Sequence, residues 1–216
     1  GQITINSGKT YTIRNGTGTD LSVFGNIVIQ NGTLTTSTSS TTIFNSGSIL
    51  DAGTSQITGS GDFTLSSGAT LKTANVSGLN GTLTTSGTKS LSTGSNFEFN
   101  GSSTQATGTL MPSTVNNITI NNLSGVTLSQ ATTVSGTLAL TTGLLILGSN
   151  VLTLGTSATI AGTPSATNMI VAVGTGELRK NFASTGSFTF PVGDNTGTAE
   201  YSPVTLNFTS GTFSSA

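Results

Sequence analysis

The sequence predicts an all-β chain that folds as a parallel β-helix, or β-solenoid, with a C-terminal β element outside the solenoid. Three observations lead to this fold class: a near absence of charge, short alternating apolar runs, and imperfect internal repetition. Thr, Ser, Gly and Asn together make up more than half of the chain, and only 6% of the residues are charged. Helical domains carry charged faces, so this composition excludes a helical protein.

The strands are predicted from apolar residues that alternate with polar ones. The clearest runs are Ile3 to Ile5, Ile27 to Ile29, Phe63 to Leu65, Phe97 to Phe99 and Ile118 to Ile120. β-Branched and aromatic residues at every second position, between clusters of Gly, Ser and Asn, are typical of strands. Because such runs recur throughout, the polar bias does not indicate disorder.

Repetition favours a solenoid over a β-sandwich, which the spacing of the strands would also allow. A phrase Ser-Gly-x-(Thr or Ile)-(Leu or Tyr) begins at Ser7, Ser46, Ser67 and Ser124. Its spacing is close to multiples of about twenty, which indicates coils of that length. The heptapeptide NGTLTTS occurs at Asn31 to Ser37 and again at Asn80 to Ser86. This second spacing is not such a multiple, so coil length must vary or an insertion intervenes.

Two regions are predicted, with a boundary at Pro164. Residues 1–163 are expected to form solenoid coils, and residues 164–216 a cap on the open end or the start of a sandwich module. Proline cannot donate to a strand ladder, and Pro164, Pro191 and Pro203 all fall in the second region. The apolar run from Gly136 to Ile160 is expected to be tightly stacked core, held by Leu138, Leu140, Leu145, Leu147, Leu152 and Leu154.

The second half of the chain resembles the long, repetitive, adhesin-like surface proteins of Bacteroidota. The segments Phe97 to Gly155 and Asn168 to Asn195 carry this resemblance, whereas the first half shares only the style. The resemblance implies a secreted or cell-surface protein with a β-solenoid stalk, exported in the manner of type IX secretion cargo. It brings no catalytic residue that matches a position of this chain.

The sequence predicts a protein that is not an enzyme and needs no cofactor or metal. Without His or Cys, Ser-His-Asp, Cys-His and zinc arrangements are impossible. The remaining enzymatic alternative is a polysaccharide-cleaving β-helix with converging carboxylates, for which Asp51 and Asp62 are the candidates. Asp62 and Asp194 are also weak candidates for calcium, but turn chemistry explains them better.

Two candidate surfaces remain. Threonines at alternate strand positions, Thr33 and Thr35 in one copy of the heptapeptide and Thr82 and Thr84 in the other, are expected to face outward and to stack in ladders. A register of Thr-x-Thr unbroken over many coils would favour ice binding. Glu177, Arg179 and Lys180 form the densest charge group and are a possible docking patch, or an ordinary strand whose Leu178 points inward.

We therefore expect a non-enzymatic structural or adhesive segment of a secreted or cell-surface bacterial protein, possibly a fibre subunit, and an excerpt of a longer chain. The alternative is a solenoid that binds ice or polysaccharide through a Thr/Asn-rich face. The expected partners are further copies of the chain, end to end, or extracellular polysaccharide. Neither nucleic acid nor membrane insertion is expected, because the net charge is only −1 and no run approaches the roughly 18 apolar residues of a spanning helix.

Overall fold

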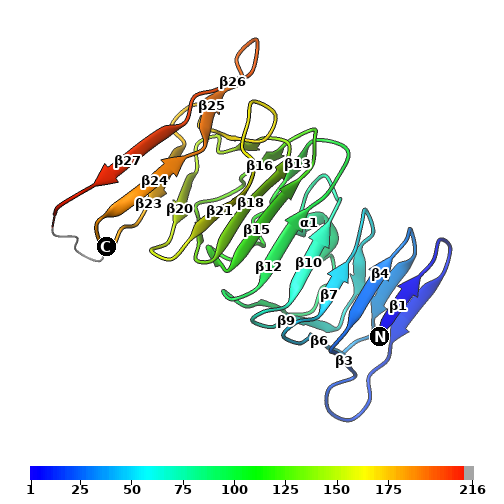
Figure 1. The fold of residues 1–216 in the computed structure, drawn as a ribbon. Coiled ribbons are helices and arrows are strands. Elements are labelled where there is room, and N and C mark those ends of the chain that lie inside the picture. The colour runs from blue at the N-terminus through cyan, green and yellow to red at the C-terminus, as the bar shows by residue number, and fades with distance from the viewer. Residues whose placement is uncertain (212–216) are drawn as a thin grey trace.

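The computed structural model describes residues 1–211 and shows a β-solenoid (Figure 1). The described chain holds 27 short strands and one short helix, and successive strands pair in parallel with strands of the neighbouring coil. The predicted fold class is confirmed.

Sheet A is the one sheet that follows the whole solenoid. Its eight parallel strands lie in the order β1-β4-β7-β10-β12-β15-β18-β21, so each coil begins with one of them. Their bounds are Gln2–Ile5 (β1), Asn26–Ile29 (β4), Ile49–Asp51 (β7), Thr70–Thr73 (β10), Asn96–Phe99 (β12), Asn117–Asn121 (β15), Thr137–Thr142 (β18) and Thr159–Gly162 (β21).

The other two faces of the first four coils are sheets B and C. Sheet B consists of β2 (Thr10–Ile13), β5 (Thr33–Thr36) and β8 (Ile57–Gly59). In the fourth coil the helix α1 (Leu79–Thr82) precedes Leu83, which forms a single parallel bridge to Ile57. Sheet C consists of β3 (Leu21–Val23), β6 (Thr41–Phe44), β9 (Asp62–Leu65) and β11 (Lys89–Leu91).

From the fifth coil onward these two faces are sheets D and E. Sheet D contains β13 (Gln105–Ala106), β16 (Val126–Thr127), β19 (Leu145–Ile146), β22 (Ile170–Val171), β25 (Val192–Asp194) and β26 (Glu200–Tyr201). Sheet E contains β14 (Thr114–Val115), β17 (Thr132–Val134), β20 (Val151–Leu154) and β23 (Glu177–Lys180). Sheet A therefore joins two stacks whose side faces are separate sheets.

The coils are on average longer than predicted, and they are not uniform. Successive register partners along sheet A are Ile3, Ile27, Leu50, Leu71, Phe97, Ile118, Leu138 and Ile160. The longest step runs from Leu71 to Phe97 and the shortest from Ile118 to Leu138. The heptapeptide spacing now has an explanation. Leu34 pairs with Ile57 and Ile57 with Leu83, so the two copies lie two coils apart, and α1 lengthens the second step.

One aliphatic core fills the interior. The six leucines expected to hold the coils between Gly136 and Ile160 are each at most 1% exposed, which confirms that this run is stacked core. Four phenylalanines, Phe44, Phe63, Phe97 and Phe99, are the largest fully buried side chains. Fully burying a side chain of this size contributes about 1.5–3 kcal/mol, and no single coil could do so alone.

The Ser-Gly phrases are corners. Gly8, Gly47, Gly68 and Gly125 all have positive φ, between 70° and 88°. At two of these corners the backbone closes a tight turn, with Ser48 N donating to Asn45 O and Ala69 N to Ser66 O, both at 3.0 Å. Glycine has no Cβ to clash in this left-handed region, which is why the phrase recurs where the chain changes face.

The parallel ladder does not end at the expected boundary. Beyond Pro164, Ile170 pairs with Leu145 and Leu178 with Leu152, both in parallel, so residues 164–180 complete an eighth coil. Pro164 lies in the corner between β21 and β22, where a missing N–H costs nothing. The side-chain amide of Asn168 donates to the carbonyls of Leu140 (3.1 Å) and Thr163 (2.8 Å), which fixes this corner on the coil below.

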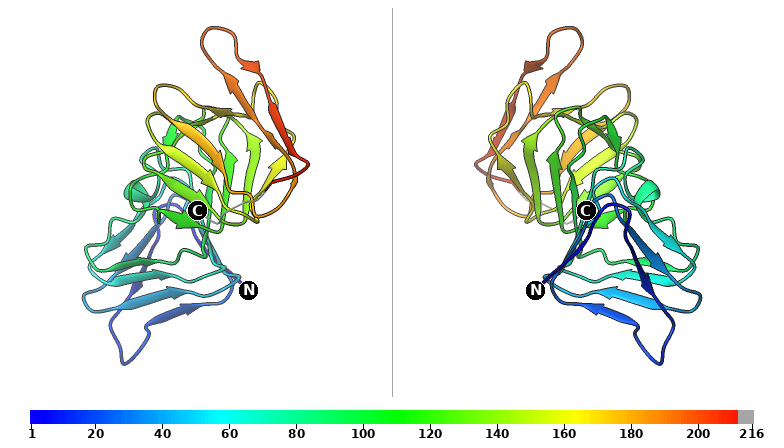
Figure 2. Two further views of the ribbon diagram at one scale, coloured as in Figure 1. Left: turned by 90° about the vertical axis from the view of Figure 1, so that its left-hand side faces the viewer. Right: turned by 90° about the vertical axis from the view of Figure 1, so that its right-hand side faces the viewer.

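Apart from an isolated antiparallel bridge between Ser165 and Asn168, antiparallel pairing begins only after that coil, and β25 still pairs in parallel with β22. Strand β24 (Gly186–Phe190) pairs with β27 (Val204–Phe208) in a two-stranded ribbon, and β25 pairs with β26 in a hairpin. Both lie at the end of the solenoid opposite the N-terminus (Figure 2). Phe188 and Val192 pack against the core. The described part of the chain has no helix long and apolar enough to cross a membrane.

Candidate functional surfaces

Sheet B carries a threonine column on its outer side. The register places Thr12, Thr35 and Thr58 side by side, and the bridge at Leu83 places Thr84 next in the row. The hydroxyl oxygens of Thr35 and Thr58 are 3.2 Å apart, and the Thr84 hydroxyl donates to the Ile57 carbonyl at 3.1 Å. Thr33, Thr35 and Thr84 thus lie on the outside as expected.

Thr82 does not. It is fully buried as the last residue of α1, and its hydroxyl lies 2.6 Å from that of Thr73 and donates to the Gly78 carbonyl at 3.0 Å. The expectation that Thr82 faces outward is therefore wrong. The physical reason is the helical turn, which rotates the first half of the second heptapeptide by comparison with the strand of the first copy.

This geometry breaks the Thr-x-Thr register after two coils. Thr10 and Thr12 in β2 lie beside Thr33 and Thr35 in β5. In the third coil the position next to Thr33 is Gln56, and in the fourth it is the buried Thr82. The ordered array of paired threonines on this surface therefore extends over only the first two coils.

A second threonine column, on sheet E, was not predicted. Thr114, Thr133, Thr153 and Arg179 are successive register partners. They line an open groove of about 400 Å³ together with Ser113, Ala131, Thr132 and Val151. The sequence signal was a Thr that precedes Val or Leu in three consecutive coils, at Thr114, Thr133 and Thr153, but it becomes visible only when the coil register is known.

The charge group on β23 is divided between the two sides of the strand. Glu177 and Arg179 face outward and form an ion pair with a closest nitrogen to oxygen distance of 2.6 Å. Leu178 packs against the core between them. Lys180 points to the same side as Leu178, so the structure does not bring the three charged residues together in one outward patch.

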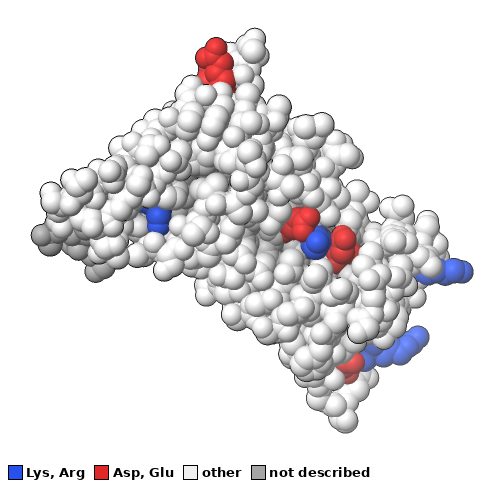
Figure 3. Space-filling model, in the orientation of Figure 1, with Lys and Arg blue, Asp and Glu red and all other residues white. Residues whose placement is uncertain are grey.

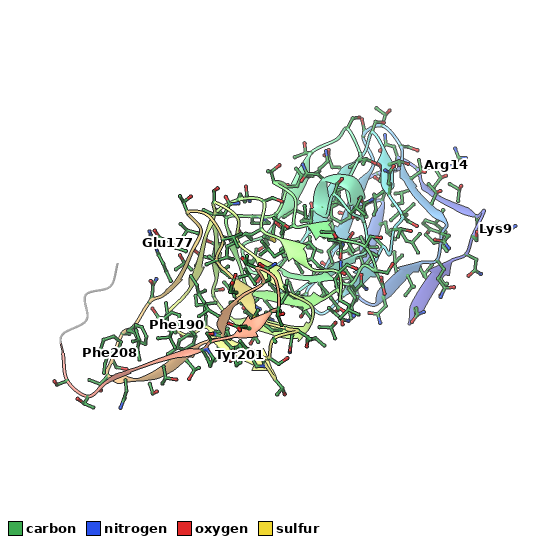
Figure 4. The ribbon with its side chains drawn as sticks, turned by 90° about the horizontal axis from the view of Figure 1, so that it is seen from above. Lys9, Arg14, Glu177, Phe190, Tyr201 and Phe208 are labelled. Atoms are coloured by element: carbon green, nitrogen blue, oxygen red, sulfur yellow. The ribbon has the colours of Figure 1, made fainter. Side chains whose placement is uncertain are left out.

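Lys180 is held at the end of the solenoid. Its Nζ donates to the carbonyls of Gly155 (2.6 Å) and Thr156 (2.8 Å) and lies 5.8 Å and 5.6 Å from the ring centres of Phe182 and Phe188. Burial lowers the pKa of Lys180 from its ordinary value. Figure 4 shows Glu177, Phe190 and Phe208 at this end of the molecule, and Lys9 and Arg14 at the other.

The carboxylates are spread over different faces. Asp51 and Asp62 belong to one coil but to sheets A and C. Asp51 is the register partner of Lys72, whose Nζ lies 2.9 Å from Glu98. Figure 3 shows this view of the molecule as mostly uncharged, with one row of adjacent acidic and basic side chains near its middle. Within residues 1–211, no three acidic side chains gather in a group that could hold a metal ion.

The two weak calcium candidates serve the backbone. Asp62 accepts the N–H of Thr88 at 2.8 Å. Asp194 accepts the N–H of Thr196 at 3.0 Å, and hydrogen bonds from Thr196 hold the pKa of Asp194 below its ordinary value. The contact of Asp194, two residues along the chain, is that of a turn residue. The contact of Asp62 instead joins β9 to the following coil, so turn chemistry does not explain Asp62.

Comparisons of the chain with protein-family models, curated proteins and solved structures find no match.

Proposed function

We propose that this chain is a non-enzymatic structural rod, a segment that sets the distance between whatever lies at its two ends. The unbroken sheet A carries this proposal. Eight strands at ~4.8 Å spacing give a rod of about 34 Å, with backbone hydrogen bonds directed along its axis. Each coil buries its aliphatic side chains against the next, so the length follows from the number of coils.

The proposed setting is the outside of a bacterial cell, as part of a secreted or cell-surface adhesin. Two features support it. The surface is rich in hydroxyl and amide groups and holds few ionisable ones, so its properties change little with pH. The resemblance of the second half of the chain to repetitive surface proteins of Bacteroidota points the same way, and immunogold labelling of the producing cells would test it.

A coil deletion tests the spacer role. Removing residues 117–136 takes out one full coil, because Thr137 then follows Asn116 and β18 stacks on β12 in place of β15. The chain has no cysteine, so Thr4→Cys and Ala161→Cys would place spin labels on the first and last strands of sheet A. We expect the distance between the labels to shorten by about 4.8 Å.

Deletion of residues 117–126 is the matched control, since it removes half a coil and breaks the register. This control should lose cooperative unfolding. An unchanged label distance in the folded full-coil deletion, or equal folding of both deletions, would contradict the spacer role.

End-to-end association of copies is a further part of the proposal. The inward residues of the first coil are available for a contact, since Ile3 and Tyr11 are 43% and 41% exposed whereas their partners Ile27 and Leu34 are buried. Lys9 and Arg14 lie at this end, and Asp194 and Glu200 lie in the hairpin at the other. Opposite charges favour head-to-tail contact. Negative-stain imaging should show uniform fibres at low salt; isolated short rods would exclude it.

Polysaccharide binding is the second candidate, favoured by the hydroxyl-lined groove on sheet E. Arg179, which is paired with Glu177, lies at one end of the groove, and the ligand proposed for it is an acidic glycan that would compete for this guanidinium. Calorimetry with neutral and acidic polysaccharides would test this, with Thr133→Val as the variant expected to weaken binding and Thr35→Val on sheet B as its control. Ice binding is the weaker form of this candidate, because its paired register extends over only two coils.

A further inference from the structure

Toward the C-terminus the side sheets of the solenoid end in different ways, and two of them end there in a regular strand. Sheet B gives way to the helix α1, and sheet D closes with the antiparallel hairpin β25–β26. Among the described residues, sheet C ends at β11 and sheet E at β23. A free strand edge presents unpaired N–H and C=O groups to any extended chain nearby, including a second copy.

Both terminal strands carry a lysine at a core position. In sheet C, Lys89 continues the inward column of Thr42 and Phe63, which are both fully buried. In sheet E, Lys180 continues the inward column of Val115, Val134 and Leu154, which are also fully buried. Lysine is rare in this chain, which holds only six Lys and Arg together, yet two lysines occupy the same unusual place in the fold.

The backbone alternation shows which groups of β11 and β23 point away from the preceding coil. On β11, Thr88 accepts from Phe63 and Ser92 donates to Leu65, both at 2.9 Å. Even-numbered residues therefore bond to β9, and the N–H and C=O groups of Lys89 and Leu91 face away from it. On β23, Glu177 and Asn181 donate to Asn150 and Leu154, so the groups of Leu178 and Lys180 face away from β20.

The two lysines reach water or carbonyls by different routes. Lys89 is half-buried, and its Nζ extends to the carbonyl of Gly87 at 3.4 Å. Lys180 reaches the carbonyls of Gly155 and Thr156. In each case, a strand added to the free edge would stack its inward side chain on the ammonium group. That added strand would have to desolvate a charge inside the aliphatic core, which is strongly unfavourable.

We propose that Lys89 and Lys180 close the free edges of β11 and β23 against strands from other copies of this chain. Strand hydrogen bonds run along the rod axis, so Lys180 closes the C-terminal end of sheet E to strand pairing, and Lys89 closes the edge of sheet C at the fourth coil. End-to-end contact of copies would then depend on charge and side-chain packing and not on strand pairing in sheet E. The idea is independent of the spacer role, because a rod of any function gains from closed edges, and its test measures association and not length.

The test replaces each lysine by methionine, which keeps an unbranched stem and removes the charge. In high-salt buffer, which screens the charge-driven end-to-end contact, we expect Lys89→Met and Lys180→Met to associate with rising concentration. Light scattering after size-exclusion chromatography should show at least a doubling of their molar mass over that of the parent chain. Lys89→Arg keeps the charge and should stay monomeric. Lys72→Met is the matched control: it removes the same charge from β10, whose two edges are both paired within sheet A.

Amide hydrogen exchange identifies the surface involved. In the parent chain the amides of Lys89 and Leu91 should exchange much faster than that of Ser90, and in the assembled Lys89→Met variant the amides at these two positions should become protected. A folded Lys89→Met or Lys180→Met that stays monomeric over the same concentrations overturns the proposal for its edge. So does equal association of Lys72→Met. If a methionine variant does not fold, the same light-scattering measurement is made with glutamine at that position, which is uncharged and still polar. Association of the glutamine variant supports the proposal, and a monomeric glutamine variant overturns it.

Discussion

Two copies of NGTLTTS, at Asn31 to Ser37 and Asn80 to Ser86, lie two coils apart on the same face and have different structures. In the first copy, Asn31 is a left-handed corner residue (φ 55°) and Thr33–Thr36 form β5. In the second, Asn80, Gly81 and Thr82 belong to α1, and regular pairing is reduced to the bridge at Leu83. An identical heptapeptide thus does not fix its own backbone; the neighbouring coils do.

What the copies share is the leucine. Leu34 and Leu83 are 0% and 1% exposed and belong to one inward column with Ile57 between them. The comparison indicates that the buried column stays the same in the two local structures, whereas the residues around it adapt.

The largest expected effect concerns this shared leucine. Leu34→Ala and Leu83→Ala should each lower the free energy of unfolding by about 3 kcal/mol, since each leaves a cavity in a close-packed core. The two losses should agree within about 1 kcal/mol, despite the strand in one copy and the helix in the other. Urea denaturation followed by circular dichroism measures both; a much smaller loss at Leu83 would mean that the second copy is packed only loosely.

The next largest effect is a difference in stability between glycine-to-alanine substitutions in the two copies of the heptapeptide. A Cβ on Gly32 would lie 2.6 Å from the carbonyl oxygen of Ile5 and 2.7 Å from that of Asn6, which are backbone atoms of the coil below. Gly32→Ala should therefore cost about 2 kcal/mol. A Cβ on Gly81 would meet the side chain of Asn75, which would have to turn away from its hydrogen bonds to Gly81 O and Ser77 N. Alanine offsets part of that loss, because it favours the helix by up to about 1 kcal/mol. Thermal unfolding should rank Gly32→Ala clearly below Gly81→Ala, and the reverse order would refute this account.

The threonines give a smaller contrast. Thr82→Val removes a buried hydroxyl and leaves that of Thr73 without this partner, so we expect a loss of about 1.5 kcal/mol. Thr33→Val, on the outer side of β5, should change stability by less than about 0.5 kcal/mol. Equal losses in parallel denaturation curves would show that Thr82 is not buried in solution.

The smallest effect belongs to the corner asparagine. Asn31→Gly suits the positive φ and should change the free energy of unfolding by no more than about 0.5 kcal/mol. Asn80→Gly should cost about 1 kcal/mol, because Asn80 accepts from Leu110 N (3.0 Å) and donates to Thr109 (3.1 Å) of the next coil. Differential scanning calorimetry of the pair resolves these shifts, and a stabilising Asn80→Gly would argue against the contacts to Thr109 and Leu110.

The sequence predicted what depends on period and composition. Alternating runs identified four strands of sheet A (β1, β4, β12 and β15) and β9 of sheet C, and the leucines between Gly136 and Ile160 identified the core. The sequence did not predict the local structures that are fixed by contacts with the next coil. The helix α1 is tied to the following coil where Leu79 N donates to Thr107 O, and no local pattern in α1 reports a partner so distant along the chain. Thr82 was misplaced for this reason.

Similar reasoning explains the other differences. Pro164 indicated a boundary because proline ends ladders, but it lies in a corner, and the coil continues after it. Lys180 was grouped with Glu177 and Arg179 because they are adjacent in sequence, yet strand alternation places it on the inner side. The groove on sheet E needed the spacing between Thr114, Thr133 and Thr153, which is known only once the coils are in register.

The change of side sheets after the fourth coil has a mechanical consequence. At the junction between the fourth and fifth coils, β10 and β12 pair in sheet A, and the second face is joined by Ala106 N to Val76 O and Leu79 N to Thr107 O. On the third face, among the residues that the structure describes, β11 and β14 belong to different sheets. Tension applied to the two ends loads every junction equally in series. The rod should therefore yield first between these two coils. It should open on the face of β11 while the two coils stay joined through sheet A.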